Sequence, residues 1–310
     1  MNSRLLIYGL LATLLMSCSL EDDRDECRYQ VRLHYHETID GLDQFQQDIK
    51  SMQHLLFDSD GRFIEWLGST HNGSQDVDIG GLSNGSYTVV TVANATEKTL
   101  FEDYDDIKTF RLVHDTRYTR TRSDDGNEGD YANTDELYWR MVTFTFDGTS
   151  QVVDCPLSNI HCHLHVRAEW KGVPKQSGLW TMRLYNVHTE YMAGQIGLDV
   201  NGRSHPVETE RTGTHRIESD TFNFELESEF ITFRWTNNEM PMLQIWCEDE
   251  PVTPLMDLKK AFEEWGWYPD RAQIQDYYVE LLIDNDGAVD MRASGRANVG
   301  DWIDGGIIGY

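Results

Sequence analysis

Residues 28–36 read RYQVRLHYH and show the pattern that decides the fold class. Tyr29, Val31, Leu33 and Tyr35 alternate with polar side chains. Because successive side chains of a strand point to opposite faces, this alternation predicts a β-strand with one buried face. Further short strands are predicted along the chain, at residues 52–57, 62–67, 77–79, 87–93, 137–146, 160–170, 179–185, 222–226, 230–235, 242–248, 277–283 and 288–293.

Helices are predicted in two places only. Apolar residues keep helical spacing between residues 42 and 52. Thr253 as N-cap and Pro254 at the first helical position predict a second helix, with apolar residues on one face as far as Trp265.

The predicted strands form two sets of about seven, a number typical of β-sandwiches. A break near residues 147–156 separates the two sets. We therefore expect an all-β protein with few short helices, built from two tandem antiparallel Greek-key β-sandwiches. Their predicted ranges are residues 27–150 and 151–310.

Composition excludes some partners. The chain has 310 residues, with 26 Lys and Arg against 53 Asp and Glu, so its formal charge is −27. A nucleic-acid partner needs a basic surface that releases counterions, and this balance argues against one. It also argues against a polybasic attachment to anionic lipid.

The amino terminus reads as an export signal. Arg4 precedes Leu5–Met16, an apolar run of 12 residues, which is too short to cross a bilayer but suits a signal peptide. The following Cys18 completes Leu15-Met16-Ser17-Cys18, which resembles a bacterial lipobox. We therefore expect a signal peptide over residues 1–17, lipidation of Cys18 and an acidic, lipidated tether over residues 18–26. An ordinary signal peptide with an incidental cysteine is the alternative.

Four other cysteines remain, namely Cys27, Cys155, Cys162 and Cys247. Export makes disulfides possible, and four cysteines allow three pairings that the sequence cannot distinguish. Cys155 and Cys162 could pair only if the chain turns between them. Free buried thiols are an equal alternative.

Three motifs resemble catalytic or calcium-binding sites. Gly81–Gly85 matches G-x-S-x-G around Ser83, but a strand-like run follows it where a nucleophile elbow needs a helix. Asp58–Gly61 and Asp284–Gly287 lack the spacing of an EF-hand loop. All three are interpreted as hairpin turns, so we expect no enzyme activity and no catalytic residue.

Histidines alternate on two predicted strands. His161, His163 and His165 share one strand face, and His34 and His36 repeat the pattern elsewhere. Zinc would need further ligands that the sequence does not identify. We therefore interpret both groups as the exposed faces of strands and expect neither a metal nor another cofactor.

Several segments together carry a family resemblance. They are the lipobox with its acidic tether, CRYQVRLHY at 27–35, LFDSDGRF at 56–63, GLSNGSYTVV at 81–90, the turn AN at 93–94 and LYW at 137–139. Their order and spacing resemble the FimB-type anchor and minor subunit lipoproteins of type V fimbriae in Bacteroidales. The likeness covers residues 18–150 and is weaker over 151–310.

The resemblance implies two transthyretin-like sandwiches and a lipid-anchored, surface-exposed position on the cell outer membrane, at the base of a fimbrium. It also implies that the protein attaches a pilus and limits its length, with pilin subunits joining by exchange of β-strands. We expect Cys27–Tyr35 to fill the protein's own groove. Val299–Tyr310 could act as a donated strand, or form a plain final strand and tail. The candidate strand-exchange residues are Trp302, Ile303, Ile307, Ile308 and Tyr310.

A glycan-binding surface lipoprotein of a polysaccharide-uptake system is the alternative function. Trp66, Trp139, Trp170 and Trp302 are candidate sugar-stacking residues.

Overall fold

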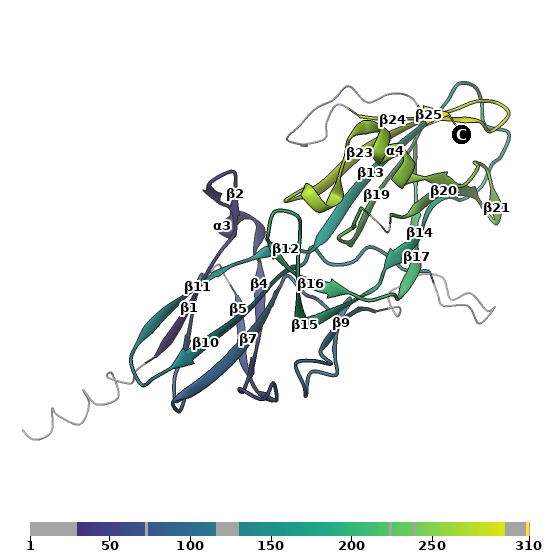
Figure 1. The fold of residues 1–310 in the computed structure, drawn as a ribbon. Coiled ribbons are helices and arrows are strands. Elements are labelled where there is room, and N and C mark those ends of the chain that lie inside the picture. Colours follow the sequence, from purple (N-terminus) through teal and green to yellow (C-terminus); the bar gives the residue numbers. More distant parts are fainter. Residues whose placement is uncertain are drawn as a thin grey trace, which may run out of the picture.

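The computed structural model describes residues 30–71, 74–115, 130–222, 225–237, 240–294 and 308–309. Within these ranges the chain is almost entirely β-structure, which confirms the predicted fold class (Figure 1). Two short α-helices lie among the strands, α3 (Phe45–Asp48) and α4 (Leu258–Trp265). No helix in these ranges has the length and apolar character needed to span a bilayer.

The first half of the chain forms a sandwich of two sheets. The smaller sheet has the order β11-β1-β6 and the larger one β12-β10-β7-β4-β5. Their bounds are β1 (Val31–His36), β4 (Ser51–Phe57), β5 (Phe63–His71), β6 (Asp76–Ile79), β7 (Gly85–Ala93), β10 (Tyr138–Phe146), β11 (Gln151–Pro156) and β12 (Ser158–Asn159). Apolar side chains from both sheets, such as Leu33, Leu56 and Val89, meet in one core.

The turns of this sandwich follow from local chemistry. Oδ1 of Asp58 accepts hydrogen bonds from the backbone N–H groups of Asp60 and Arg62, and Gly61 closes the turn with φ +83°. The G-x-S-x-G segment is also a turn with a strand after it, since Ser83 lies between β6 and β7. Those two strands belong to different sheets, so this turn crosses between the sheets and is not the predicted hairpin, whereas Asp58–Gly61 joins the paired strands β4 and β5 as predicted.

The second half forms another sandwich. Its sheets have the orders β18-β19-β13-β23-β24-β25 and β17-β14-β20-β21, with β22 paired to β20. Their bounds are β13 (His161–Trp170), β14 (Trp180–His188), β17 (Thr212–Glu218), β18 (Asp220–Phe222), β19 (Glu225–Phe233), β20 (Met242–Cys247), β21 (Glu250–Pro251), β22 (Met256–Asp257), β23 (Gln275–Ile283), β24 (Val289–Ala293) and β25 (Ile308–Gly309). Asp284–Gly287 is the predicted hairpin turn between β23 and β24.

The helices differ from their predictions. Helix α4 begins at Leu258 with Asp257 as its N-cap, whose carboxylate accepts from the N–H groups of Lys259 and Lys260. Thr253 instead accepts a hydrogen bond from the Ile245 N–H, so its hydroxyl is engaged in the sheet. The helical spacing of residues 42–52 produces only the single turn of α3, because the chain then enters β4.

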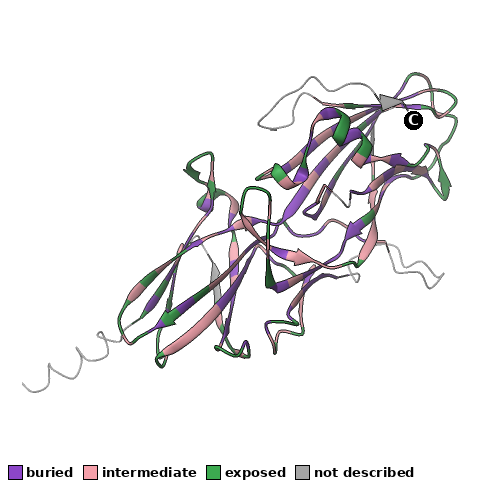
Figure 2. Ribbon diagram, in the orientation of Figure 1, coloured by how far each residue is buried: buried purple, intermediate pink, exposed green. Residues whose placement is uncertain are grey.

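A third layer joins the two halves. The sheet β16-β15-β9-β8 contains β8 (Thr99–Glu102) and β9 (Arg111–His114) from the first half, with β15 (Glu190–Leu198) and β16 (Ser204–Glu208) from the second. Its apolar side chains pack on the outer face of the larger first sheet, around Trp139. Figure 2 shows buried residues running from the first sandwich through this junction into the second.

The predicted boundary at residue 150 does not separate the sheets. The strands β11 and β12 follow residue 150 but complete the first sandwich. Each sandwich also contains a parallel pair, β1 with β11 and β13 with β23, where the sequence predicted antiparallel strands only. Both differences arise because strand pairing is non-local, so alternation within a segment does not reveal its partner.

Candidate functional site

The first strand, β1, occupies the centre of its three-stranded sheet. It pairs antiparallel with β6 and parallel with β11, so both of its hydrogen-bonding edges are used. Val31, Leu33 and Tyr35 are fully buried in the core. The described part of the N-terminal segment therefore fills a groove between two strands of its own chain.

A buried polar contact locks this strand to the opposite sheet. The hydroxyl of Tyr35 lies 2.6 Å from Oγ1 of Thr91 and 3.2 Å from Nδ1 of His54. Burial raises the pKa of Tyr35 and lowers that of His54 to about 4, so both side chains are neutral at neutral pH. A neutral, hydrogen-bonded cluster specifies one position of β1 against the core.

The exposed face of β1 makes polar contacts with both neighbouring strands. These are Arg32–Asp78 at 2.8 Å, His34–Asp76 at 2.9 Å and His36–Asp154 at 3.1 Å. The first two reach β6 and the third reaches β11. The outer face thus supports the same pairing as the core.

The carboxyl end of the chain lies at a sheet edge. Ile308 pairs with Met291, and Gly309 with Asp290, which places β25 antiparallel on β24. Trp302, Ile303, Ile307 and Tyr310 fall outside the described residues. Of the five predicted strand-exchange residues, only Ile308 is located, and it lies in the protein's own sheet.

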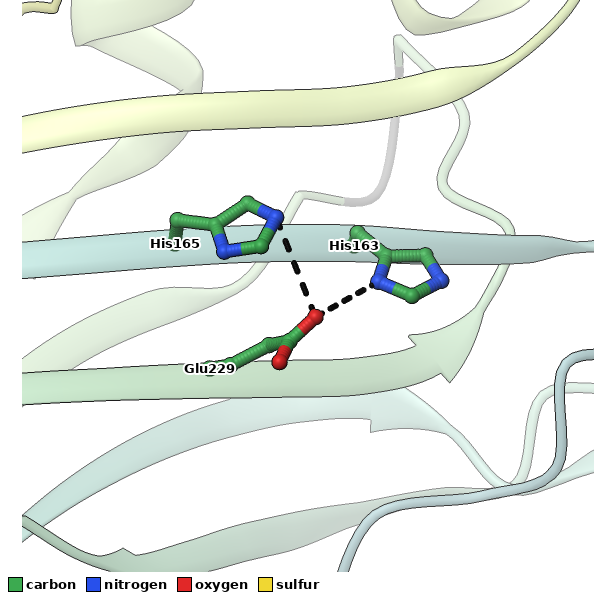
Figure 3. Close-up of side chains that lie close together, drawn as sticks. All are labelled: His163, His165 and Glu229. Atoms are coloured by element: carbon green, nitrogen blue, oxygen red, sulfur yellow. Dashed lines mark hydrogen bonds and ion pairs between the residues drawn. The ribbon is translucent and has the colours of Figure 1, made fainter.

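The predicted histidine stripe divides into two environments. His161 is buried against Tyr138, and burial lowers its pKa to about 3. His163 and His165 are half-buried, on the face of β13 that points away from the second core. Figure 3 shows both imidazoles directed toward the carboxylate of Glu229, which comes from the neighbouring strand β19.

A cleft of about 570 Å³ lies where the two halves meet. Glu37, Arg140 and Arg234 contribute to its wall. Arg234 is buried and donates to the carbonyl oxygens of Pro269, Ala272 and Gln273. Because these carbonyls engage the guanidinium, Arg234 acts as a structural brace of the cleft.

Comparison with known proteins identifies the family. The family model of the fimbrillin-A associated anchor proteins Mfa1 and Mfa2 matches residues 22–303. The chain belongs to this family. The match confirms the resemblance to fimbrial anchor proteins and extends it over the second half. No relative is found among curated proteins.

Several solved structures share the fold of this chain. The fimbrial anchor protein Mfa2 from Porphyromonas gingivalis aligns with TM-score 0.58 and 13% identity, over 91% of this chain and 99% of that one. A proposed adhesin from Bacteroides ovatus aligns with TM-score 0.60 and 14% identity, over 89% and 95%. A proposed polysaccharide-binding protein from Bacteroides thetaiotaomicron aligns with TM-score 0.58 and 12% identity, over 87% and 96%. Identities this low indicate a shared fold alone.

The cysteines of this family member are free where they are described. Cys155 is buried in the first core, and Cys162 and Cys247 in the second. The Cys155–Cys162 pair considered from the sequence is not formed, because the two side chains enter different cores. Burial raises the pKa of Cys155 to about 12 and also raises that of Cys162, so neither is a thiolate nucleophile. Cys18 and Cys27 lie outside the described residues.

Sequence reasoning missed the carboxylates beside the histidines. Glu229 lies on β19 and Asp276 on β23, the strands that flank β13. Both alternate with apolar residues and look like ordinary exposed strand positions. Only the pairing of three distant segments brings them to the histidines.

Proposed function

We propose that this protein is an outer-membrane lipoprotein, attached through Cys18, that anchors a fimbrium to the cell and limits its length. Membership of the fimbrial anchor family supports the anchor or adhesin role. The observation that carries the finer proposal is the place of β1 inside its own sheet. A subunit whose groove is permanently filled by its own first strand cannot accept a strand there, so it terminates a chain of subunits.

In this proposal, one N-terminal segment carries both the lipid, at Cys18, and the strand that fills the groove, β1. Cys18 precedes Val31, the first residue of β1, by 13 residues. An extended segment of that length spans at most about 43–47 Å. The acids at its start repel anionic headgroups, which favours an extended tether. The first sandwich is then held close to the membrane while the second projects from it.

Lipidation is tested by a Cys18→Ala substitution. We expect the variant to lose acyl labelling and fimbriae to be shed into the medium, measured by cell fractionation and electron microscopy. Cys27→Ala is the matched control, because it leaves the lipobox intact and should keep fimbriae attached. Attached fimbriae and an acylated protein in the Cys18→Ala strain would contradict the proposal.

Strand exchange at the carboxyl end is a separate part of the proposal. Deletion of residues 305–310 should release fimbriae or alter their length if this segment enters a pilin groove. Glu250→Ala, on the edge strand β21 of the other sheet, serves as the control for a non-specific edge effect. Attached fimbriae of normal length after the deletion would show that this segment is not donated.

Glycan binding is the second candidate, favoured by the fold shared with a proposed polysaccharide-binding protein. Of the described candidate tryptophans, Trp139 and Trp170 are buried, and Trp66 is 39% exposed. Trp66 packs against the rings of Phe63, Phe101 and Tyr104. Loss of polysaccharide retention in a Trp66→Ala variant, with fimbrial attachment unchanged, would favour this function.

A further inference from the structure

Two imidazoles and two carboxylates converge on the outer face of β13. His163 and His165 project from this strand, which is hydrogen-bonded to β19 on one side and to β23 on the other. Glu229 lies opposite His165 on β19, and Asp276 lies opposite His163 on β23. Each flanking strand therefore supplies one carboxylate beside the histidine pair, and Figure 3 shows the one from Glu229.

The donor atoms are close together. Oε1 of Glu229 lies 2.9 Å from Nδ1 of His163 and 3.8 Å from Nε2 of His165. Oδ1 of Asp276 lies 3.1 Å from the same Nε2 of His165. The ligand atoms of the two histidines and Glu229 all lie within 4.8 Å of one another.

We propose that His163, His165, Glu229 and Asp276 form a binding site for a divalent transition metal of the Zn²⁺ class. Zn²⁺ binds imidazole nitrogen and carboxylate oxygen at about 2.0–2.2 Å, which puts neighbouring ligand atoms of a tetrahedral site about 3.3–3.6 Å apart. Three separations, 2.9, 3.1 and 3.8 Å, lie within a few tenths of an ångström of that spacing. His163, His165 and Glu229 form the compact group of ligand atoms, and Asp276, which contacts His165 alone, would move inward as the fourth ligand while the metal replaces the proton shared by His163 and Glu229.

The surroundings support a cation at this point. Oδ1 of Asp276 is buried, and its contact in the cluster is the ion pair with Nε2 of His165, so a carboxylate oxygen is already aimed at a ligand atom of the proposed site. The ring of Tyr278 stacks on His165 at 4.1 Å and 9°, which holds that imidazole in place. Glu136 lies 3.8 Å from Nε2 of His163, on the side away from Glu229, where it can orient the ring as an outer carboxylate.

The site is accessible and its ligands are selective. His165, Glu229 and Tyr278 line an open hollow of about 410 Å³, which gives an ion a route from solvent. Imidazole ligands favour Zn²⁺, Cu²⁺ or Ni²⁺ over the hard ions Ca²⁺ and Mg²⁺, which prefer all-oxygen sites.

The cluster is also distinct within the described part of the chain. Among the described residues, it is the one group of three histidines, cysteines or acids whose ligand atoms all lie within 4.8 Å of one another.

The second histidine pair provides an internal comparison. His34 and His36 also share a strand face and also contact carboxylates, Asp76 and Asp154. Each of those carboxylates contacts a different histidine, whereas Glu229 contacts both His163 and His165, so three donors converge only around the latter pair. The two pairs differ in geometry and share their chemistry.

The experiment titrates the untagged full chain with ZnCl₂ by isothermal calorimetry, and follows metal content after dialysis. We expect one Zn²⁺ per chain, with affinity at least ~10-fold weaker in His165→Gln and in the near-isosteric Glu229→Gln. The His34→Gln/His36→Gln double variant should bind as the wild type does. Zn²⁺ should raise the unfolding temperature of the wild type and the double variant, but not of the two site variants.

Equal Zn²⁺ affinity in the wild type and Glu229→Gln would overturn the proposal, as would the absence of saturable one-to-one binding. Far-ultraviolet circular dichroism confirms that each variant is folded before titration. A control titration with MgCl₂ should give no saturable binding. Mg²⁺ binding as tight as Zn²⁺ binding would contradict the proposal, because it would show that the acids of the surface bind cations without selectivity. Because the readout is metal affinity, the result is independent of fimbrial attachment and of the proposed function.

Discussion

Glu37 is an acidic side chain buried inside the protein. It is 3% exposed, and its Oε2 has no hydrogen-bond partner among the described residues. Burial, followed by the nearby acid Asp48, raises its pKa from 4.5 to about 8. Between pH 4.5 and about 8, this carboxyl group is therefore protonated in the folded protein and ionised in the unfolded chain.

A Glu37→Gln substitution should change the pH dependence of stability. The raised pKa stabilises the fold fully below pH 4.5, and this contribution is lost as the pH rises through 8. Relative to the variant, the wild type should lose about 1.4 kcal/mol per pH unit across this window. Denaturant unfolding at several pH values measures the difference.

The control for this experiment is Glu65→Gln, at an exposed position of β5. As a substitution on the exposed surface, it should change the free energy of unfolding little. A pH profile for Glu37→Gln that runs parallel to the wild type would contradict a raised pKa at Glu37.

At the scale of elements, β1 is the strand on which the first sandwich depends. Its apolar side chains enter the core from the middle of a sheet, and its exposed side chains contact both neighbours. The two faces contribute unequally to stability, because a fully buried apolar side chain contributes about 1.5–3 kcal/mol and an exposed ion pair about 0–1 kcal/mol. The stability of β1 in its sheet should therefore depend mainly on its buried apolar side chains.

A Leu33→Ala substitution should lower the free energy of unfolding by about 2–5 kcal/mol, because Leu33 is fully buried and its removal leaves a cavity. The matched control is Arg32→Ala on the opposite face of the same strand, which should have little effect. Denaturant unfolding compares the two. Equal losses in both variants would show that the outer ion pairs hold β1 as strongly as the core does.

At the scale of the whole molecule, the third layer makes one body of the two sandwiches. Nε1–H of Trp139, in the first half, donates to the carbonyl of Ala193 on β15 at 3.0 Å. The next residue, Gly194, lies so close to the backbone of the first half that an added Cβ would meet the carbonyl oxygen of Ile107 at 1.7 Å. The junction has no room for a side chain at this position.

A Gly194→Ala substitution should therefore force β15 away from the first half, at a cost of about 3 kcal/mol or more. We expect the unfolding transition in differential scanning calorimetry to move to lower temperature and to separate into two. Gly80→Ala is the control, because a Cβ there meets no atom within 4 Å. A single unshifted transition for Gly194→Ala would show that the halves do not depend on this contact.

The sequence by itself determined the all-β class, the position of β1 and the hairpin turns at Asp58–Gly61 and Asp284–Gly287. These features are local, since alternation records which face of a strand is buried and Asp and Gly record where the backbone must turn. The family resemblance likewise rested on the order of such local segments.

Tertiary structure alone decided the third layer, the parallel pairs and the grouping of Glu229 and Asp276 around the histidines. The strands of the third layer were not predicted, because β8 and β9 are only four residues long and β15 and β16 are interrupted by glycine and proline. The carboxylates were missed because a strand's own pattern says which face is buried, whereas its neighbour and register are chosen by the packing of the whole chain.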